Sequence, residues 1–334
     1  PGAHGTLESL AGIAWNEHLD KRERKAQVFC LYLATPSRCP GNDLTNGRDG
    51  ACFIATMSSM RQKDVPMKLN EFLSRHAVFT VDELDRVLSA RGSGKPNTRK
   101  SLLTYYRSRG RILPIRRGLY ATVPLGGDPA SSPVDPYLVA AKMSVDAVLA
   151  YHTALEFHGK AYSIYTRVQY LSARKSLPLQ FRSHEFTRVP VPHLLLEKGQ
   201  ELFGVVSHKR SGVELRVTNL ERTFVDVLDR PDLTGSWEEI WRSLESVEFF
   251  DLDQVVEYVL LLENATTAAR VGFFLEQHKE KLMADDAHLN PLRSLRPHQP
   301  HYFVRGKRKG CQWVKDWNLL IPVEILNRSW GEVL

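Results

Sequence analysis

The segment 67–124 carries closely spaced signals for short helices, and these signals limit the folds that it can adopt. Apolar residues on one face predict a first helix over 68–75. Thr80 and Glu83 have the spacing of a capping box, so a second helix is expected to begin at Thr80. Gly92 is a natural end for that helix, because glycine readily adopts the left-handed conformation that follows a C-terminus.

A third helix and a hairpin complete this segment. Proline suits the first position of a helix and glycine its end, so a helix is predicted from Pro96 to Gly110. Two strand-like runs follow at 112–115 and 119–123, separated by a tight basic turn. Three helices followed by a hairpin predict a winged helix-turn-helix.

The positive charge of the chain is concentrated in the same segment. Residues 91–117 contain nine Arg or Lys and no Asp or Glu, and 67–124 contains twelve basic and four acidic residues. The whole chain carries a net charge of +7, so the remainder is close to neutral. Such a run can be a solvated surface, but the complete lack of acids within a winged-helix pattern favours contact with double-stranded DNA.

The third helix is the predicted recognition helix, whose first residues reach base edges in the major groove. Its N-terminal cations oppose the helix dipole, and DNA would offset that cost. Arg99 or Lys100 suits guanine and Asn97 suits adenine, whereas cations near the helix end and on the wing suit phosphates or the minor groove. The predicted DNA-contacting residues are Lys95, Asn97, Thr98, Arg99, Lys100, Tyr105, Arg107, Arg109, Arg111, Arg116 and Arg117.

The chain as a whole is predicted to be an α+β protein. The winged helix-turn-helix would be followed by a larger α+β domain with a mixed sheet and a helical C-terminal half. The predicted segments are a poorly structured extension (1–66), the winged helix (67–124), a linker (125–136) and the α+β domain (137–334). Strands are predicted at 167–172, 179–188, 202–208, 213–217 and 318–325, and helices at about 135–143, 152–158, 219–229, 237–247, 251–263 and 266–283. Capping boxes are predicted at Thr218/Glu221 and Ser236/Glu239.

Composition excludes several classes of protein. No apolar run approaches the ~20 residues that span a bilayer, and no signal pattern begins the chain, so a cytoplasmic protein without a membrane partner is expected. The four cysteines contain no C-x-x-C pair, which argues against a zinc site or a disulfide framework. No phosphate-binding loop or hydrolase motif occurs, and no cofactor or metal is expected.

Two motifs in the second domain are candidates for catalysis. His152 and Glu156 share a helix face, but His158 points elsewhere, so the zinc-protease spacing is absent and a core or capping histidine is favoured. Arg222 and Asp226 have ion-pair spacing, with Glu221 in the first turn of the same helix. A nuclease needs several convergent carboxylates around a metal, so a structural role is favoured here too. The basic tail patch 305–309 is interpreted as a solvated loop, with a second phosphate contact as the alternative.

Four stretches together resemble the AbiEi family, the antitoxin and transcriptional regulator of type IV abortive-infection toxin–antitoxin systems. They are FTVDEL (79–84), RGRILPIRRGLYATV (109–123), AYHTALEFHG (150–159) and VTNLERTFVDVLDRP (217–231). The resemblance covers about 67–285. It implies a winged helix that binds inverted repeats in its own promoter and represses the operon. It also implies a second domain that counteracts a cognate nucleotidyltransferase-like toxin.

In that picture the two later motifs are structural or antitoxic parts of a non-enzymatic domain. Their residues are His152, Glu156, His158, Glu221, Arg222 and Asp226. Two alternatives stay open from the residues themselves. One is a nuclease with a winged-helix targeting domain, and the other is a transcription factor whose second domain senses a ligand.

Overall fold

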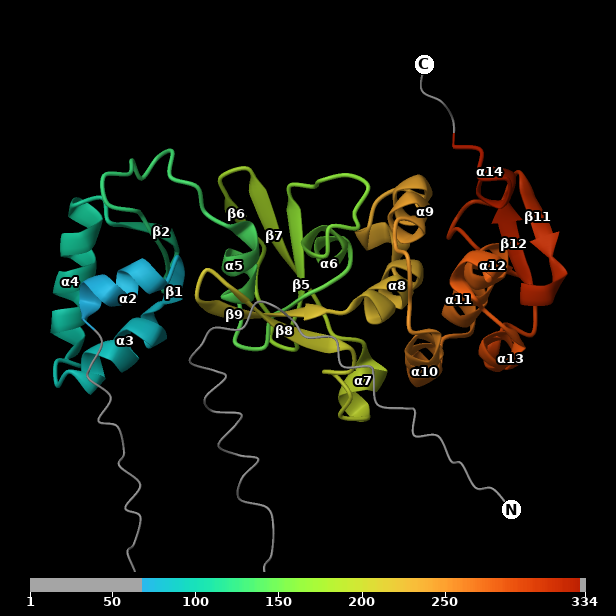
Figure 1. Ribbon diagram of the computed structural model, residues 1–334, viewed down its shortest axis with the longest axis horizontal. Coiled ribbons are helices and arrows are strands. Elements are labelled where there is room, and N and C mark those ends of the chain that lie inside the picture. Colours follow the sequence, from blue (N-terminus) through green and yellow to red (C-terminus); the bar gives the residue numbers. More distant parts are fainter. Residues whose placement is uncertain (1–67, 331–334) are drawn as a thin grey trace, which may run out of the picture. The chain divides into compact units, whose positions relative to one another are not determined.

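The computed structural model describes residues 68–330 of the chain, and the predicted extension over 1–66 lies outside them (Figure 1). The α+β class is confirmed: helices with a small antiparallel sheet come first, then a six-stranded mixed sheet, then helices with a second small sheet. No helix within the described range is both long and apolar enough to cross a membrane.

The three predicted helices and the hairpin are present at the start of the described chain. Thr80 caps α3 in a complete box, because its hydroxyl accepts the Glu83 N–H at 3.3 Å and its own N–H donates to the Glu83 carboxylate at 2.8 Å. A short additional strand, β1, was not predicted, and it pairs with β3 at the edge of the order β1-β3-β2. The elements are α2 (Leu69–Arg75), β1 (Val78–Thr80), α3 (Val81–Ala90), α4 (Pro96–Ser108), β2 (Ile112–Arg116) and β3 (Leu119–Thr122).

This small sheet buries side chains on both of its faces. On one face, Phe79 and Ile112 pack with α2 and α3. On the other, Val78, Leu119 and Ala121 belong to the same core as residues of α5 (Pro136–Ala141) and the six-stranded sheet. The winged helix therefore shares a hydrophobic core with the part of the chain that follows the predicted linker, and the domain boundary at 125–136 stays a prediction.

The six strands of the central sheet run in the order β6-β7-β5-β4-β9-β8, with β5/β7 and β4/β9 parallel and the other pairs antiparallel. The single strand predicted over 179–188 is wrong, because a turn with a positive φ of 54° at Arg182 divides it into a hairpin. In Figure 1, α5 and α6 lie against this sheet, and both contact β5. The elements are β4 (Val148–Leu149), α6 (His152–Phe157), β5 (Arg167–Leu171), β6 (Leu179–Phe181), β7 (His184–Val189), α7 (His193–Glu197), β8 (Val205–Arg210) and β9 (Val213–Thr218).

Helices dominate the C-terminal region and enclose the largest core, which includes Trp241, Phe274 and Trp317. The helix predicted over 266–283 ends earlier, and α13 was missed because it contains Pro291. Only the first part of the strand predicted over 318–325 forms. The elements are α8 (Leu220–Asp229), α9 (Trp237–Glu245), α10 (Leu252–Leu262), α11 (Ala265–Gln277), α12 (Lys279–Leu282), α13 (Asp286–Leu295), β10 (His301–Tyr302), β11 (Cys311–Val314), β12 (Leu319–Pro322) and α14 (Val323–Leu326).

One of the two capping boxes predicted in this half is wrong. Asn219, not Thr218, caps α8 by accepting the Arg222 N–H, while the Thr218 hydroxyl bonds to Thr223. The second box is half formed: Ser236 accepts the Glu239 N–H at 3.1 Å, but the Glu239 carboxylate turns inward to other partners. Burial of Glu239 explains the difference, since its oxygens serve an internal network described below.

Candidate nucleic-acid interface

One face of α4 is open to solvent along its length. Asn97, Lys100, Ser101, Thr104 and Tyr105 line a shallow concavity on this face, at the three- and four-residue spacing of a helix surface. In Figure 1, α2, α3 and the three-stranded sheet all lie to one side of α4. The helix has no fully buried residue, and it is held by half-buried Leu102, Leu103 and Tyr106. We call the five exposed residues the α4 face.

The first turn of α4 is basic and lacks a side-chain cap. Lys95 occupies the N-cap position without a capping hydrogen bond, and no acid lies in the first turn. Thr98 is half-buried. Arg99 forms an ion pair with Asp85 of α3, and each side chain is about one-third exposed at 34%. Residues 91–117 contain no acid of their own, but Arg99 thus pairs with an acid of the neighbouring helix. Lys95 and Lys100 have no acidic partner within residues 68–330.

The cations at the end of α4 have two kinds of environment. Arg107 and Arg109 are exposed, and the Arg109 guanidinium lies 5.6 Å from the ring centroid of Tyr105, which is 53% exposed. This cation–π contact holds an exposed cation over an exposed aromatic ring at the end of α4. Arg111 is half-buried, and its Nη1 has no hydrogen-bond partner in the described part of the chain.

The two arginines of the wing point to different partners. The Arg116 guanidinium donates to the Met143 carbonyl at 2.5 Å, which ties the wing to the end of α5. Arg117 is exposed at the turn, where Gly118 has a φ of 82° that favours glycine. Arg117 is therefore available to a ligand, whereas Arg116 would have to exchange a carbonyl partner for a phosphate.

The histidine motif of the second domain forms a buried network instead of an open site. His152 is 1% exposed, and its ring stacks on Tyr165 with centroids 3.9 Å apart. Its Nδ1 lies 3.1 Å from a Glu156 oxygen and its Nε2 lies 3.2 Å from a Glu239 oxygen. The same Glu239 oxygen accepts the Ser163 N–H at 3.0 Å. This network joins α6, α9 and the loop between α6 and β5.

Burial and hydrogen bonding act in opposite directions on Glu239. Burial raises the pKa of this carboxyl, but the hydrogen bonds from Ser163 and His152 outweigh it, and the net pKa is lowered. His158 points away from this network, as predicted, and its Nε2 lies 2.8 Å from the Thr218 carbonyl. Burial lowers the pKa of His158. Both groups therefore act as internal hydrogen-bonding partners.

The second motif is also internal. Arg222 is fully buried, and its Nη1 donates to the carbonyls of Glu201 and Phe203 at 2.9 and 2.6 Å. Its Nε lies 3.4 Å from Asp226, and the Tyr258 hydroxyl donates to the other oxygen of Asp226 at 2.7 Å. The predicted ion pair is therefore present, and Tyr258, 32 residues further along the chain, is a partner that helical spacing could not identify.

The carboxylates proposed for a nuclease do not converge. Asp226 is enclosed by Arg222 and Tyr258, whereas the Glu221 carboxylate accepts the Asp251 N–H at 3.3 Å. No group of three or more His, Cys, Asp or Glu within residues 68–330 is placed to hold a metal ion. The geometry gives a hydrolytic centre no support at either motif.

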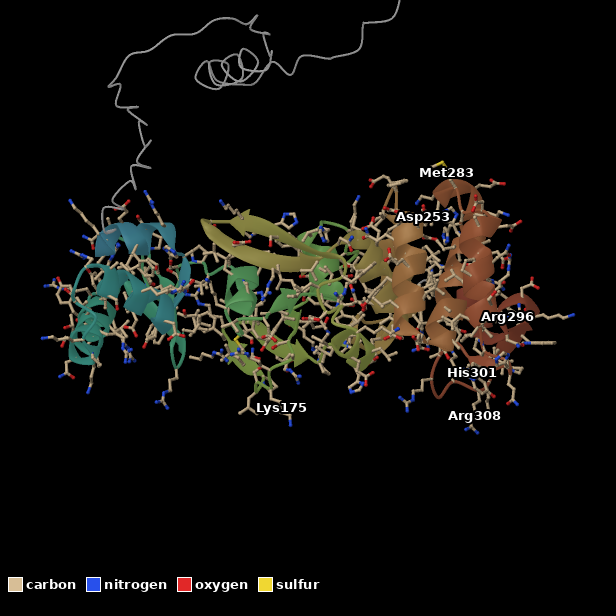
Figure 2. All side chains as sticks on the ribbon, turned by 90° about the horizontal axis from the view of Figure 1, so that it is seen from below. Lys175, Asp253, Met283, Arg296, His301 and Arg308 are labelled. Carbon is tan, nitrogen blue, oxygen red and sulfur yellow. The ribbon has the colours of Figure 1, made fainter. Side chains whose placement is uncertain are left out.

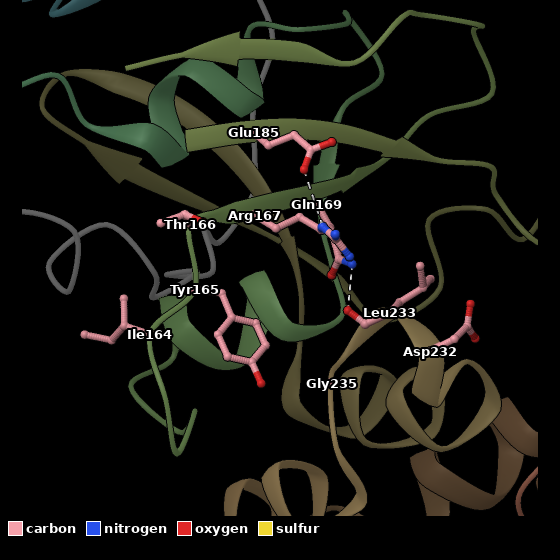
Figure 3. Close-up of a pocket in the computed structure, with 9 residues that line it drawn as sticks. All are labelled: Ile164, Tyr165, Thr166, Arg167, Gln169, Glu185, Asp232, Leu233 and Gly235. Atoms are coloured by element: carbon pink, nitrogen blue, oxygen red, sulfur yellow. Dashed lines mark hydrogen bonds and ion pairs between the residues drawn. The ribbon is translucent and has the colours of Figure 1, made fainter. Parts of the chain in front are cut away.

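A cleft of about 510 Å³ that sequence reasoning missed lies beside the histidine network (Figure 3). Gln169 lines it and donates to the Leu233 carbonyl at 2.6 Å. The Oε1 of Gln169 is buried and lacks a hydrogen-bond partner in the described range. Gly235, with a φ of 111°, leaves room for Tyr165, because a Cβ there would lie 2.4 Å from the tyrosine hydroxyl. Long-range packing creates this cleft, so no local motif signals it.

Comparison with known proteins assigns the first module. Residues 67–123 match the family described as the AbiEi antitoxin, a transcriptional regulator. The resemblance is therefore confirmed over the winged helix, whose family includes regulators of transcription. No curated protein matches the chain.

A solved structure extends the likeness at the level of the fold. The Rv2827c protein from Mycobacterium tuberculosis is similar with a TM-score of 0.50 and 20% sequence identity, over 77% of this chain and 92% of that one. At that identity the likeness concerns the fold alone. It reaches beyond the winged helix, so the two parts of the present fold occur together in another protein.

Proposed function

We propose that this chain is a DNA-binding transcriptional autorepressor that also acts as the antitoxin of a type IV toxin–antitoxin pair. The α4 face reads the major groove of inverted repeats in its own promoter, and Arg107, Arg109 and Arg117 contact phosphates. The observation that carries the proposal is the solvent-exposed α4 face, with Lys100 on it and the exposed cations Lys95, Arg107 and Arg109 towards the ends of the same helix, on a module that matches a family of regulators. The protein acts in the cytoplasm and without catalysis, cofactor or metal.

Binding to its own upstream DNA tests the regulatory half. We expect the full chain to bind a duplex from that region more tightly than a scrambled duplex. Asn97→Ala and Lys100→Ala, both on the exposed α4 face, should reduce this preference by about 1–3 kcal/mol each, because each removes a base-edge contact. Equal affinity for the two duplexes, or full preference in both variants, would contradict the proposal.

The antitoxin half requires a cognate nucleotidyltransferase-like toxin as partner. The proposal draws on the family match and on a second domain in which His152 and Arg222 are buried against internal acidic partners, as suits a binding scaffold. Removing the winged helix would uncover Leu138 and Leu215, which share a core with Leu119. The test therefore uses the full chain with the α4 face disabled, rather than a truncated protein.

Co-expression with the toxin encoded beside it separates the two activities. The Asn97→Ala/Lys100→Ala chain should still restore growth if the second domain neutralises the toxin. Continued arrest, with both proteins present at wild-type levels, would count against antitoxicity that is independent of DNA binding.

A ligand-sensing regulator is the second candidate, and the cleft in Figure 3 favours it specifically. The Oε1 of Gln169 is buried and has no hydrogen-bond partner within residues 68–330, so an N–H or O–H donor of a ligand would reach it through a movement of the cleft lining. If the cleft does not bind a regulatory ligand, wild type and Gln169→Leu should bind DNA with the same affinity whichever small molecules are added. An effector that alters DNA affinity in the wild type and not in Gln169→Leu would favour sensing.

A further inference from the structure

A basic groove lies between the wing, the end of α5 and the loop that joins β5 to β6. Its volume is about 650 Å³. Five cations line it, and Asp82 is the acid among its lining residues. The cations are Arg116, Arg117, Lys142, Arg174 and Lys175. Two of them come from the wing and three from beyond the predicted linker, so the groove joins the wing to the second domain.

Two of these cations already have partners and three are free for a ligand. Lys142 forms an ion pair with Glu83, and Arg116 donates to the Met143 carbonyl. Arg117, Arg174 and Lys175 are exposed, with no acidic partner in the part of the chain that the structure describes. Figure 2 shows Lys175 extending away from the ribbon.

The loop that carries Arg174 and Lys175 is held in place at both ends. The Ser172 hydroxyl and the Ala173 N–H donate to the two oxygens of Asp146 at 2.7 and 2.8 Å. On the other side of the cations, the Tyr170 and Ser176 hydroxyls are 2.7 Å apart. A loop fixed in this way presents its cations without a large loss of conformational entropy on binding.

Asp146 is a reliable acceptor for this loop. Burial raises the pKa of its carboxyl, but the hydrogen bonds from Ser144, Ser172 and Ala173 outweigh that effect and lower the pKa. The anchor is therefore a carboxylate at neutral pH, and it faces the backbone at the base of the loop.

We propose that Arg174 and Lys175 bind phosphates of the same DNA duplex that the winged helix contacts. The inference rests on the proposed DNA binding and assigns to the second domain a part of the interface. Its basis is continuity: Arg117 of the wing lines the same groove as the two loop cations. A backbone that reaches Arg117 meets the loop next, and phosphates are the ligand that a row of unpaired, exposed cations favours.

The test compares two double variants of the full chain by fluorescence anisotropy, on upstream and unrelated duplexes, between 50 and 300 mM salt. Arg174→Ala/Lys175→Ala should weaken binding roughly ten-fold at low salt on both duplexes and reduce the salt slope by about 2, since each lost phosphate contact removes ~0.9. Lys279→Ala/Lys315→Ala removes the same charge from exposed positions elsewhere, and its slope should stay that of the wild type.

Each alternative outcome has a distinct meaning. If the wild type binds and Arg174→Ala/Lys175→Ala keeps its salt slope, the loop contact is wrong while the proposed function stands. Titration with inorganic phosphate provides a second arm: saturable binding that is lost in this variant, with DNA affinity unchanged, would overturn the inference in favour of a small anion. If the wild type binds no DNA, the proposed function fails first.

Discussion

Helices α4 and α8 both carry arginine, and they use it in opposite ways. In α4 no residue is fully buried, and Lys100 and Arg107 face solvent. In α8 seven residues are buried, including Arg222 and Asp226, whose charges are enclosed by partners within the fold. An exposed cation retains its capacity to bind an external anion, whereas an enclosed cation stabilises the fold only as long as its partners remain.

The comparison extends to the acid-containing motifs. Charged residues in the second domain look catalytic in the sequence because they cluster, but His152 and Asp226 each contact at least two internal partners. The predictions below ask whether charge in the second domain acts on stability and charge in the winged helix acts on binding. They run from the largest expected effect to the smallest.

Arg222→Ala should have the largest effect on the fold. It leaves Asp226 as a buried carboxylate without its cation and frees the carbonyls of Glu201 and Phe203, so we expect a loss of about 3–5 kcal/mol in the free energy of unfolding. Urea denaturation measures it. Arg107→Ala, on the exposed side of α4, is the matched control and should change stability by less than about 0.5 kcal/mol. Similar losses of stability in Arg222→Ala and Arg107→Ala would contradict the difference between α8 and α4.

The pH dependence of stability should report Asp226. Burial raises its pKa to about 6, despite the opposing attraction of Arg222 and the hydrogen bond from Tyr258. The folded protein therefore holds a proton at a pH where the unfolded chain, with a carboxyl pKa near 4, has released it. The free energy of unfolding should fall as the pH rises from about 4 to about 6, by up to about 3 kcal/mol.

Asp226→Asn isolates this contribution, because the amide does not titrate in that range. The free energies of unfolding of wild type and variant, measured at pH 4, 5, 6 and 7, should diverge in slope from pH 4 through pH 6 and become parallel only towards pH 7. Parallel behaviour across the whole range would show that Asp226 has an ordinary pKa.

His152→Ala should have a smaller effect on stability. It removes a buried ring that stacks on Tyr165 and lies within 3.2 Å of Glu239, so we expect a loss of about 1–3 kcal/mol. His193 and Glu197 repeat the same four-residue spacing on the surface, with side chains 82% and 55% exposed. His193→Ala should therefore cost less than about 0.5 kcal/mol in the same denaturation experiment. An equal loss of stability in His152→Ala and His193→Ala would show that burial does not explain the effect of His152→Ala.

Asp85→Asn should have the smallest effect on stability and a visible effect on binding. The pair with Arg99 is about one-third exposed, so its loss should cost no more than about 1 kcal/mol. Removing the acid frees Arg99 for DNA, and affinity at low salt should rise several-fold. Asp232→Asn, which removes an exposed acid that pairs with Arg230 just after α8, is the control. Unchanged or weaker affinity in Asp85→Asn would count against Arg99 as a base reader.

Local signals in the sequence were enough for the three helices and the hairpin of the winged helix, but not for strand β1. A capping box at Thr80, a proline at the start of α4 and a glycine in the wing act within a few residues, and the structure contains each of them. The division of the strand at Arg182 and the cap at Asn219 were missed, although both are local: Phe181 pairs with His184 across a two-residue turn, and asparagine is itself a favoured N-cap residue. Helix α13 was hidden by Pro291.

In the candidate site too, some features follow from local sequence spacing and others depend on contacts with distant segments. Exposure of the α4 face follows from helical spacing, and the ion pair between Arg222 and Asp226 follows from their separation of four residues. Partners from distant segments do not: Asp85 on Arg99, Met143 on Arg116 and Tyr258 on Asp226 come from packing. The sequence predicted where the motifs lie, but these contacts show which residues within them are already paired inside the protein.

The central claim is that the basic face of the winged helix binds DNA, and the salt dependence of binding to upstream DNA tests it most directly. A gel-shift titration of the wild type at several salt concentrations should show affinity falling steeply with salt. Arg99→Ala/Lys100→Ala should bind more weakly and with a slope shallower by up to about 2, while Lys279→Ala/Lys315→Ala should match the wild type. A wild-type affinity and slope in Arg99→Ala/Lys100→Ala would contradict the assignment of α4 as the recognition helix.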